Sequence, residues 1–167
     1  MEIRTLPDFL INQIAAGEVI ERPAFIIKEL IENAVDAKAT EINIIVKDGG
    51  KKEIIISDNG IGMTADQLKL SINRHATSKL PKNNLNDINF LGFRGEALPS
   101  IASISELKIE SCKKDLSEGW CIKLKNNQII KFQPSPIKTG TKIIVNNVFE
   151  NVPARLKFLK SNQVENK

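Results

Sequence analysis

The feature that most restricts the fold is a strongly apolar run that stops abruptly at a polar, glycine-rich turn. Residues 53–63 read EIIISDNGIGM. The short Ile-rich part predicts a buried strand, so Asp58 stands at its end with the carboxylate projecting from the rim of a sheet. Gly60 and Gly62 permit positive φ values and a close approach of the backbone to a ligand. Asp-Asn-Gly is also ordinary turn chemistry, so the stretch predicts either a simple turn or a binding site.

The residues on either side place this turn after a hairpin. Residues 40–48 read TEINIIVKD, in which polar and apolar residues alternate, and two glycines follow before the chain returns as the Ile-rich strand. This pattern predicts two antiparallel strands. After the turn, Thr64 and Gln67 have the spacing of a capping box, which predicts a helix from Ala65 to about Asn73.

Periodicity and helix breakers assign the remaining elements. A polar stretch from His75 to Phe93 predicts a long loop or lid. Helices early and strands late predict an α+β fold, a two-layer sandwich with helices packed on one face of a mixed, mostly antiparallel sheet, in a single domain covering residues 1–167. We expect helices over about 9–16 (ended by Gly17), 23–37, 96–104 and 152–160, and strands over 106–112, 119–125, 129–133 and 140–148.

Composition agrees with a globular cytoplasmic protein. The chain has 167 residues, 41% of them hydrophobic, and a formal net charge of +4. No apolar run approaches the ~20 residues of a membrane-spanning helix, and the N-terminus lacks the features of a signal peptide. Cys112 and Cys121 have no zinc-binding spacing, so we expect reduced thiols and a bacterial-type cytosolic location. The mild positive charge permits contact with nucleic acid without requiring it.

Three polar residues share one face of the second predicted helix. Glu29, Asn33 and Asp36 are spaced four and three residues apart, opposite the apolar stripe of that helix. A solvated helix face is one interpretation of this pattern. The other is a site, because Asn is a poor helix-interior residue and because carboxylate and amide oxygens ligate a hard cation or activate water. The helix alone leaves both interpretations open.

The turn also imitates a dinucleotide fingerprint. Gly60, Gly62 and Ala65 fit the pattern G-x-G-x-x-A between a strand and a helix. We reject a nicotinamide-type dinucleotide site because the preceding strand belongs to a hairpin rather than a βαβ unit. The position near which a ribose-binding acid is expected is Lys79, and Asp58 would face the pyrophosphate. An ionised carboxylate only accepts hydrogen bonds, so it suits the amino group of adenine better.

A second glycine cluster precedes the third predicted helix. Gly92 and Gly95 flank Phe93 and Arg94 in the sequence LGFRGEALPSI. The N–H groups at the start of that helix form an anion site, to which Arg94 adds a fixed charge. The alternative is a glycine hinge, and the sequence has no P-loop.

Two further segments carry weaker signals. Residues 75–79 (HATSK) place Thr77, Ser78 and Lys79 in the polar loop. We interpret His75 as structural, because no partner arrangement for nucleophilic catalysis is evident. Thr141 starts a late strand and by itself indicates only a turn.

In combination these motifs are specific. The segments KELIENAVDA, DNGIGM, RHATSK, GFRGEALPSI and GTKIIVNNVFENVPARLKFL occur in this order, and INQIAAGEVIERP precedes them. The chain closely resembles the ATPase domain of MutL-type DNA mismatch repair proteins over essentially its whole length. That family shares its Bergerat-type ATP-binding fold with gyrase B, ninety-kilodalton heat-shock chaperones and sensor histidine kinases.

The resemblance implies a role for each matching position. Glu29 would be the general base for the attacking water, and Asn33 would ligate Mg²⁺ at the phosphates of ATP. Asp58 would accept a hydrogen bond from the adenine amino group, with Thr141 in support. Residues 77–79 would belong to the lid, and residues 94–98 would cradle the phosphates. The other nucleotide-binding positions implied are Asp36, Gly60, Gly62, Met63, Thr77, Ser78, Lys79, Gly92, Phe93, Arg94, Gly95, Glu96, Ala97 and Leu98.

The resemblance also implies partners. Members of the family work with a MutS-type mismatch recognition protein, DNA and a downstream nuclease or helicase, and they form homodimers whose N-terminal domains pair when ATP binds. In that family a second domain donates a lysine to the γ-phosphate, and the C-terminal domain dimerises. This chain would lack both, so we expect nucleotide binding with weak or no turnover. The alternative function is a non-catalytic, basic nucleic-acid-binding module, which the scarcity of aromatics (5%) disfavours.

Overall fold

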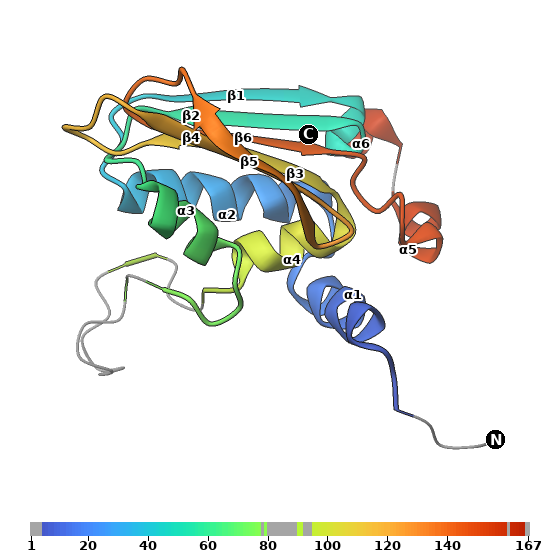
Figure 1. The fold of residues 1–167 in the computed structure, drawn as a ribbon. Helices are drawn as coiled ribbons and strands as arrows, with labels where there is room; N and C mark the ends of the chain where they lie inside the picture. Colours follow the sequence, from blue (N-terminus) through green and yellow to red (C-terminus); the bar gives the residue numbers. More distant parts are fainter. Residues whose placement is uncertain (1–4, 78, 80–89, 92–94, 160, 166–167) are drawn as a thin grey trace.

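The structure has two layers, a six-stranded sheet and helices packed against one of its faces (Figure 1). The computed structural model describes residues 5–77, 79, 90–91, 95–159 and 161–165. The helices are α1 (Asp8–Val19), α2 (Pro23–Asp36), α3 (Ala65–Ser71), α4 (Ala97–Ile104), α5 (Pro153–Phe158) and α6 (Asn162–Glu165), with a 3-10 turn η1 (Asp48–Gly50). The strands are β1 (Ile42–Lys47), β2 (Glu53–Asp58), β3 (Glu106–Cys112), β4 (Gly119–Lys125), β5 (Gln128–Ser135) and β6 (Gly140–Asn146). The predicted α+β sandwich is confirmed.

The order of the strands across the sheet is β1-β2-β6-β3-β4-β5. All pairings between these strands are antiparallel. The sheet was predicted to be mixed and mostly antiparallel, and the described strands contain no parallel pair. The last strand in sequence, β6, lies between β2 and β3. It therefore joins the early hairpin to the late strands in one sheet.

The core lies between the sheet and α2, α3 and α4 (Figure 1). Every second residue of the central strands points into it, as the pleat requires. These residues are Ile54 and Ile56 of β2, Leu107 and Ile109 of β3, Ile122 and Leu124 of β4, and Ile143 and Val145 of β6, all at most 7% exposed. The opposite face of the sheet is mostly polar and carries Glu53, Lys108, Glu110 and Lys142.

The local signals in the sequence set most element boundaries. Thr64 and Gln67 form the predicted capping box at the start of α3. Pro23 occupies the first turn of α2, where its missing N–H costs no hydrogen bond. Asn126 and Asn127, with φ values of 51° and 61°, form the tight turn between β4 and β5. The two cysteines are free and buried.

The expected stop at Gly17 is wrong, because α1 continues to Val19. Glycine can adopt the helical conformation as well as end a helix, and here the Nη2 of Arg155 donates a hydrogen bond of 2.5 Å to the Gly17 carbonyl in the last turn of α1. A Cβ at position 17 would lie 2.9 Å from that same nitrogen. The glycine is therefore used for a close side-chain contact with a residue far along the chain, rather than as a helix terminator.

A second long-range arginine contact, an ion pair, holds helix α6 in place. The Arg22 guanidinium lies 3.1 Å from the Glu165 carboxylate, whose side chain is only 1% exposed. The pair joins the residue that precedes α2 to α6. Both arginine contacts connect residues that lie far apart in the sequence.

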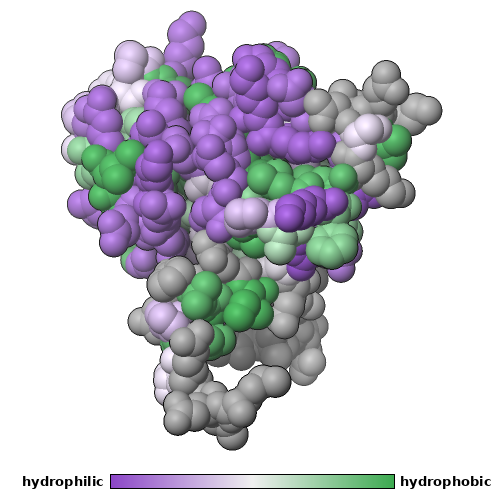
Figure 2. Space-filling view, turned by 90° about the vertical axis from the view of Figure 1, so that its right-hand side faces the viewer, coloured by the Kyte–Doolittle hydropathy of each residue, from purple (hydrophilic) through white to green (hydrophobic). Residues whose placement is uncertain are grey.

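Apolar side chains gather on the surface at the end of the molecule where α1 and α5 lie (Figure 2). Ile11 and Ile14 of α1 are 44% and 54% exposed, and Phe158 of α5 is 85% exposed. Most of the predicted loop over 75–93 lies outside the described residues, and those that are described in it form no helix or strand. Within the described part of the chain, no helix is long and apolar enough to cross a membrane.

Candidate nucleotide-binding site

Asp58 lies at the end of β2, on the core-facing side of the sheet. It has the same strand parity as the buried Ile54 and Ile56. The backbone N–H of Gly60 donates a 2.8 Å hydrogen bond to its Oδ1. Burial raises the pKa of the Asp58 carboxyl, and hydrogen bonds from the backbone of Gly60 and Thr141 oppose that rise. A partly buried hydrogen-bond acceptor thus stands at the rim, as the sequence predicts.

The loop after Asp58 is pressed against the ends of two strands. Gly62 has φ +61°, and a Cβ there would lie 1.9 Å from the carbonyl oxygen of Cys112. No side chain can occupy that space without moving the backbone of β3. Gly62 is therefore required by both the conformation and the packing of the turn.

The same loop is hydrogen-bonded to the end of α2. The Ile61 N–H donates to the carbonyl of Ala37, the residue that caps α2, at 2.9 Å. The Asn59 Oδ1 accepts hydrogen bonds of 2.8 and 3.0 Å from the backbone N–H groups of Thr40 and Glu41. These bonds fix the Asp58 turn beside the end of α2 that carries Asn33 and Asp36.

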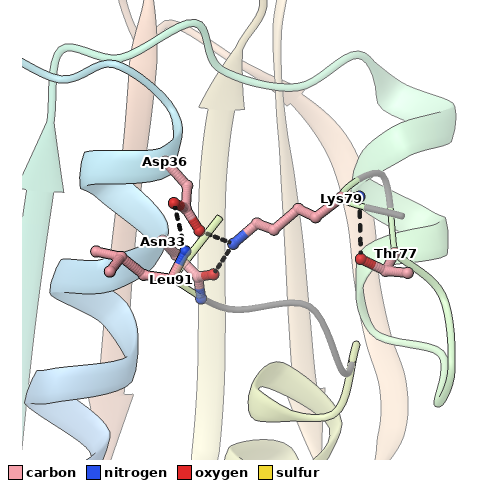
Figure 3. A network of polar contacts seen from close by, with 5 residues as sticks. All are labelled: Asn33, Asp36, Thr77, Lys79 and Leu91. Atoms are coloured by element: carbon pink, nitrogen blue, oxygen red, sulfur yellow. Dashed lines mark hydrogen bonds and ion pairs between the residues drawn. The ribbon is translucent and has the colours of Figure 1, made fainter. Parts of the chain in front are cut away.

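The polar face of α2 is not a simple solvated face. The Lys79 ammonium donates hydrogen bonds to Asn33 Oδ1 at 2.8 Å and to Asp36 Oδ2 at 2.5 Å. The side chains of Lys79 and Asp36 are only 19% and 7% exposed. Figure 3 shows Lys79 reaching across from a separate segment to the two α2 residues. A cation therefore already lies between an amide oxygen and a carboxylate oxygen.

Two further hydrogen bonds hold the surrounding backbone. The Leu91 N–H donates to Asp36 Oδ1 at 3.0 Å, and the Lys79 N–H donates to the Thr77 hydroxyl at 3.1 Å (Figure 3). Leu91 and the ammonium of Lys79 thereby contact the α2 face, whereas Thr77 contacts the backbone of Lys79 (Figure 3). Of the predicted lid residues, Ser78 lies outside the described residues.

Glu29 lies one turn before Asn33 on the same face of α2. Its side chain is 29% exposed, and its Oε1 lies 3.7 Å from the Lys28 ammonium. The stronger contact of Lys28 is with Glu32, at 2.8 Å. The Glu29 carboxylate is therefore partly shielded yet open to water.

The start of α4 faces the segment that precedes Lys79. The His75 N–H donates to the Gly95 carbonyl at 3.2 Å, and His75 Nδ1 lies 3.2 Å from Glu96 Oε1. Glu96 occupies the N-cap of α4 without a side-chain capping bond. Ala97 and Leu98 form the first turn of α4, as predicted, whereas Gly92, Phe93 and Arg94 lie outside the described residues.

Thr141 connects Asp58 to a residue that the sequence reasoning missed. It pairs with Asp58 across β2 and β6 and with Ser111 across β6 and β3. The Ser111 hydroxyl lies 2.9 Å from the Thr141 hydroxyl, accepts a 2.9 Å hydrogen bond from the Met63 N–H, and donates to the Gly140 carbonyl at 3.0 Å. The sequence did contain a signal for this residue. Ser111 comes two residues after Ile109 and four after Leu107, so the alternation of the strand places it on the core-facing side.

The described parts of the site thus combine three kinds of group. Hydrogen-bond acceptors lie at the rim of the sheet. Amide and carboxylate oxygens of α2 bind the ammonium of Lys79, and α4 provides a helix N-terminus. Such a set can receive an amino-bearing base, a hard cation and an anion. These are the components of a nucleotide bound together with a metal ion.

Sequence comparison identifies the class of protein. Residues 21–155 match the family described as histidine kinase-, DNA gyrase B- and HSP90-like ATPases. The chain belongs to this ATPase family.

Within the family, the chain is of the MutL type. It is 52% identical to the DNA mismatch repair protein MutL of Azorhizobium caulinodans over 99% of this chain and 26% of that protein. It is 54% identical to MutL of Streptococcus uberis, over 98% and 25%. The chain therefore spans about a quarter of the length of these relatives.

Solved structures agree with this assignment. The Aquifex aeolicus MutL ATPase domain complexed with ADP has a TM-score of 0.72 and 30% identity, covering 89% of this chain and 51% of that chain. An N-terminal domain of a DNA repair protein has a TM-score of 0.74 and 31% identity, over 88% and 42%. The fold predicted from the sequence is that of MutL ATPase domains.

Proposed function

We propose that this chain binds ATP together with Mg²⁺ between the Asp58 turn and the polar face of α2. The observation that carries the proposal is the hydrogen bond from Ile61 to Ala37, because it joins the base-accepting turn to the helix that bears Asn33. Asp58 accepts from the adenine amino group in this proposal, with Gly60, Gly62 and Met63 beside it. The ADP bound to the Aquifex aeolicus domain supports a nucleotide of this kind.

The oxygen donors on α2 fit a magnesium ion. Mg²⁺ prefers oxygen ligands and usually binds through one or two protein groups, with water and phosphate oxygens completing its shell. The Asn33 Oδ1 and Asp36 Oδ2 atoms already hold the Lys79 ammonium. We assign Asn33 as the ligand and Asp36 as its charged neighbour; the Lys79 ammonium would have to leave these two oxygens for an ion to bind there. When bound, Mg²⁺ would neutralise phosphate charge and order the triphosphate.

The hydrolytic step is assigned to Glu29. Its carboxylate lies on the same helix face as Asn33 and is partly open to water, so it can orient a water molecule and accept its proton. The N–H groups of Ala97 and Leu98 at the start of α4 would hold phosphate oxygens, because a helix N-terminus favours an anion. Thr77, Lys79, Gly95 and Glu96 complete the proposed phosphate side.

For the intact protein we propose an ATP-driven switch in DNA mismatch repair. ATP binding would pair the N-terminal domains of a homodimer and regulate contact with a MutS-type protein, DNA and a downstream nuclease or helicase. A slow cycle suits a switch whose conformational steps limit the rate.

Thermal unfolding with a non-hydrolysable ATP analogue tests the proposal. At about 100 times the dissociation constant, the ligand should raise the melting temperature by roughly 5–10 °C. Asp58→Ala should abolish this shift. Asn33→Ala should keep part of it but lose the additional shift caused by Mg²⁺.

Asn43→Ala is the matched control for Asn33→Ala, because Asn43 is exposed on the edge strand β1. It should behave like the wild type. Equal shifts with NAD, or a shift with DNA and none with the ATP analogue, would reject the proposal and favour a dinucleotide or nucleic-acid-binding module.

A further inference from the structure

We propose that Ser111 orients the Thr141 hydroxyl so that two acceptors, Asp58 and Thr141, face the amino group of the base. This inference rests on the proposed ATP site and adds a determinant of base selection to it. Ser111 is fully buried, so it acts as a positioning residue rather than by touching the nucleotide.

The three residues form one row across the sheet. Asp58, Thr141 and Ser111 lie directly opposite one another on the adjacent strands β2, β6 and β3. Directly opposed residues of antiparallel strands point to the same face. The preceding core-facing residues on all three strands are apolar, so this row is the polar end of an otherwise apolar surface.

Hydrogen-bond counting fixes the direction of the Thr141 hydroxyl. A serine hydroxyl has one hydrogen to donate and two lone pairs. Ser111 accepts from the Met63 N–H, and the Gly140 carbonyl can only accept, so the single hydrogen of Ser111 goes to that carbonyl. The 2.9 Å contact with Thr141 is then possible only if Thr141 donates to Ser111. The Thr141 hydroxyl is left with lone pairs for any other partner.

Burial keeps this arrangement in place. Ser111 is 0% exposed and Thr141 is 8% exposed. If the Thr141 hydroxyl pointed the other way, Ser111 would either donate to Thr141 and leave the Gly140 carbonyl, or lose its hydrogen bond with Thr141. Losing a hydrogen bond in a buried position is costly. The polarity is therefore built into the sheet before a ligand arrives.

Two acceptors side by side select for an amino group. The amino group of adenine has two hydrogens to donate, whereas a purine with a carbonyl at that position has none and would face two acceptors. Burial raises the pKa of Asp58, and its carboxylate accepts backbone N–H hydrogen bonds from Gly60 and Thr141, which oppose that rise. The pair should thus favour ATP over inosine triphosphate, which differs at this group.

Calorimetric binding of ATP and inosine triphosphate to the whole chain tests the inference. The wild type should prefer ATP by at least about tenfold, as expected when a site built for a donor meets an analogue without one. Ser111→Ala should reduce this preference about fivefold or more, because the freed Thr141 hydroxyl can turn and donate to the carbonyl. Ser105→Ala removes the hydroxyl of another buried serine, at the far end of β3 from Ser111, and should keep the wild-type preference.

Thr141→Val provides a second route if Ser111→Ala does not fold. It removes the hydroxyl while keeping the shape of the side chain, so the preference for ATP should again fall. The inference is overturned if Ser111→Ala weakens both nucleotides by the same factor, or if Thr141→Val keeps the wild-type preference. A wild-type chain that binds neither nucleotide would reject the proposed function itself, which separates the two failures.

Discussion

The two sides of the proposed site are built in different ways. At the rim of the sheet, Asp58, Thr141 and Ser111 are held by strand register, backbone N–H groups and hydroxyl contacts. On α2, Asn33 and Asp36 are held by the ammonium of Lys79, at the end of a long side chain from a separate segment. The geometry of the rim therefore depends on the backbone of the sheet, and that of the α2 side depends on the ammonium of a long lysine side chain.

This difference indicates a division of labour. A preorganised rim loses little conformational entropy when a base binds, so it suits recognition. An ammonium on a flexible stem can be exchanged for another cation without unfolding the sheet. The base side should therefore be rigid in all states of the domain, whereas the phosphate side should change with ligand. The following variants test that contrast.

The largest effect is expected from Gly62→Ala. The new Cβ would collide with the Cys112 carbonyl and would sit at φ +61°, so we expect a loss of about 3 kcal/mol or more in the free energy of unfolding. Gly17→Ala is the control, because its Cβ meets only the flexible Arg155 guanidinium and alanine favours the helix. Urea unfolding of both variants measures the difference. Similar stabilities would show that the base side is not rigid.

A smaller loss is expected from Lys79→Ala. Removing the ammonium leaves the nearly buried Asp36 carboxylate without this counter-charge, which should cost about 2 kcal/mol. Lys125→Ala serves as the control, because its ion pair with Glu106 is exposed at the lysine and should change stability little. Urea unfolding at low salt compares the two. Equal losses would mean that the α2 contact is an ordinary surface pair.

A loss of about 1 kcal/mol is expected from Thr64→Ala. The Thr64 hydroxyl accepts a hydrogen bond from the Gln67 N–H, and the Gln67 side-chain oxygen accepts one from the Thr64 N–H. Removing the hydroxyl leaves the Gln67 N–H without its cap. Nucleotide affinity should stay within about twofold, because the rim is held by other bonds. A large loss of affinity would show that the rim depends on α3.

The smallest effect on stability is expected from Asp58→Asn, and it depends on pH. The pKa of Asp58 is raised in the folded state by burial. Its favourable contribution is therefore complete below the pKa of the unfolded chain and is lost as pH rises through the folded pKa. The amide of the variant does not ionise, so the stability of Asp58→Asn relative to the wild type should increase with pH across that window.

Urea unfolding at several pH values between about 3.5 and 7 measures this trend, while nucleotide binding should be lost at every pH. A relative stability that falls with rising pH would contradict the prediction. A flat profile would mean that the hydrogen bonds from Gly60 and Thr141 cancel the effect of burial.

Much of the fold was predictable because its signals are local. The capping box at Thr64, the proline at the start of α2, and the alternation in β3 and β6 each depend on neighbouring residues. The Asp58 turn was predictable for the same reason. Its glycines and acid lie within five residues, which predicted the turn, whereas a ligand was implied only by the combination of motifs that resembles the MutL family.

The features that the sequence did not reveal depend on distant contacts. Lys79 lies 43 residues from Asp36, and no periodicity reports that its side chain crosses to α2. The helix continues past Gly17, and the carbonyl of Gly17 accepts a hydrogen bond from Arg155, 138 residues away. Ser111 was accessible in principle, since a serine at an apolar parity position of a strand needs a partner. Its partners became known only with the position of β6.

The two arginine contacts of α1 and α2 also bear on how the protein is made. Arg155 and Glu165 are added 138 and 143 residues after their partners Gly17 and Arg22. At roughly 5–20 residues per second, a ribosome needs on the order of ten seconds to supply them. During that interval α1 displays its apolar residues without the contact that Arg155 later makes with Gly17.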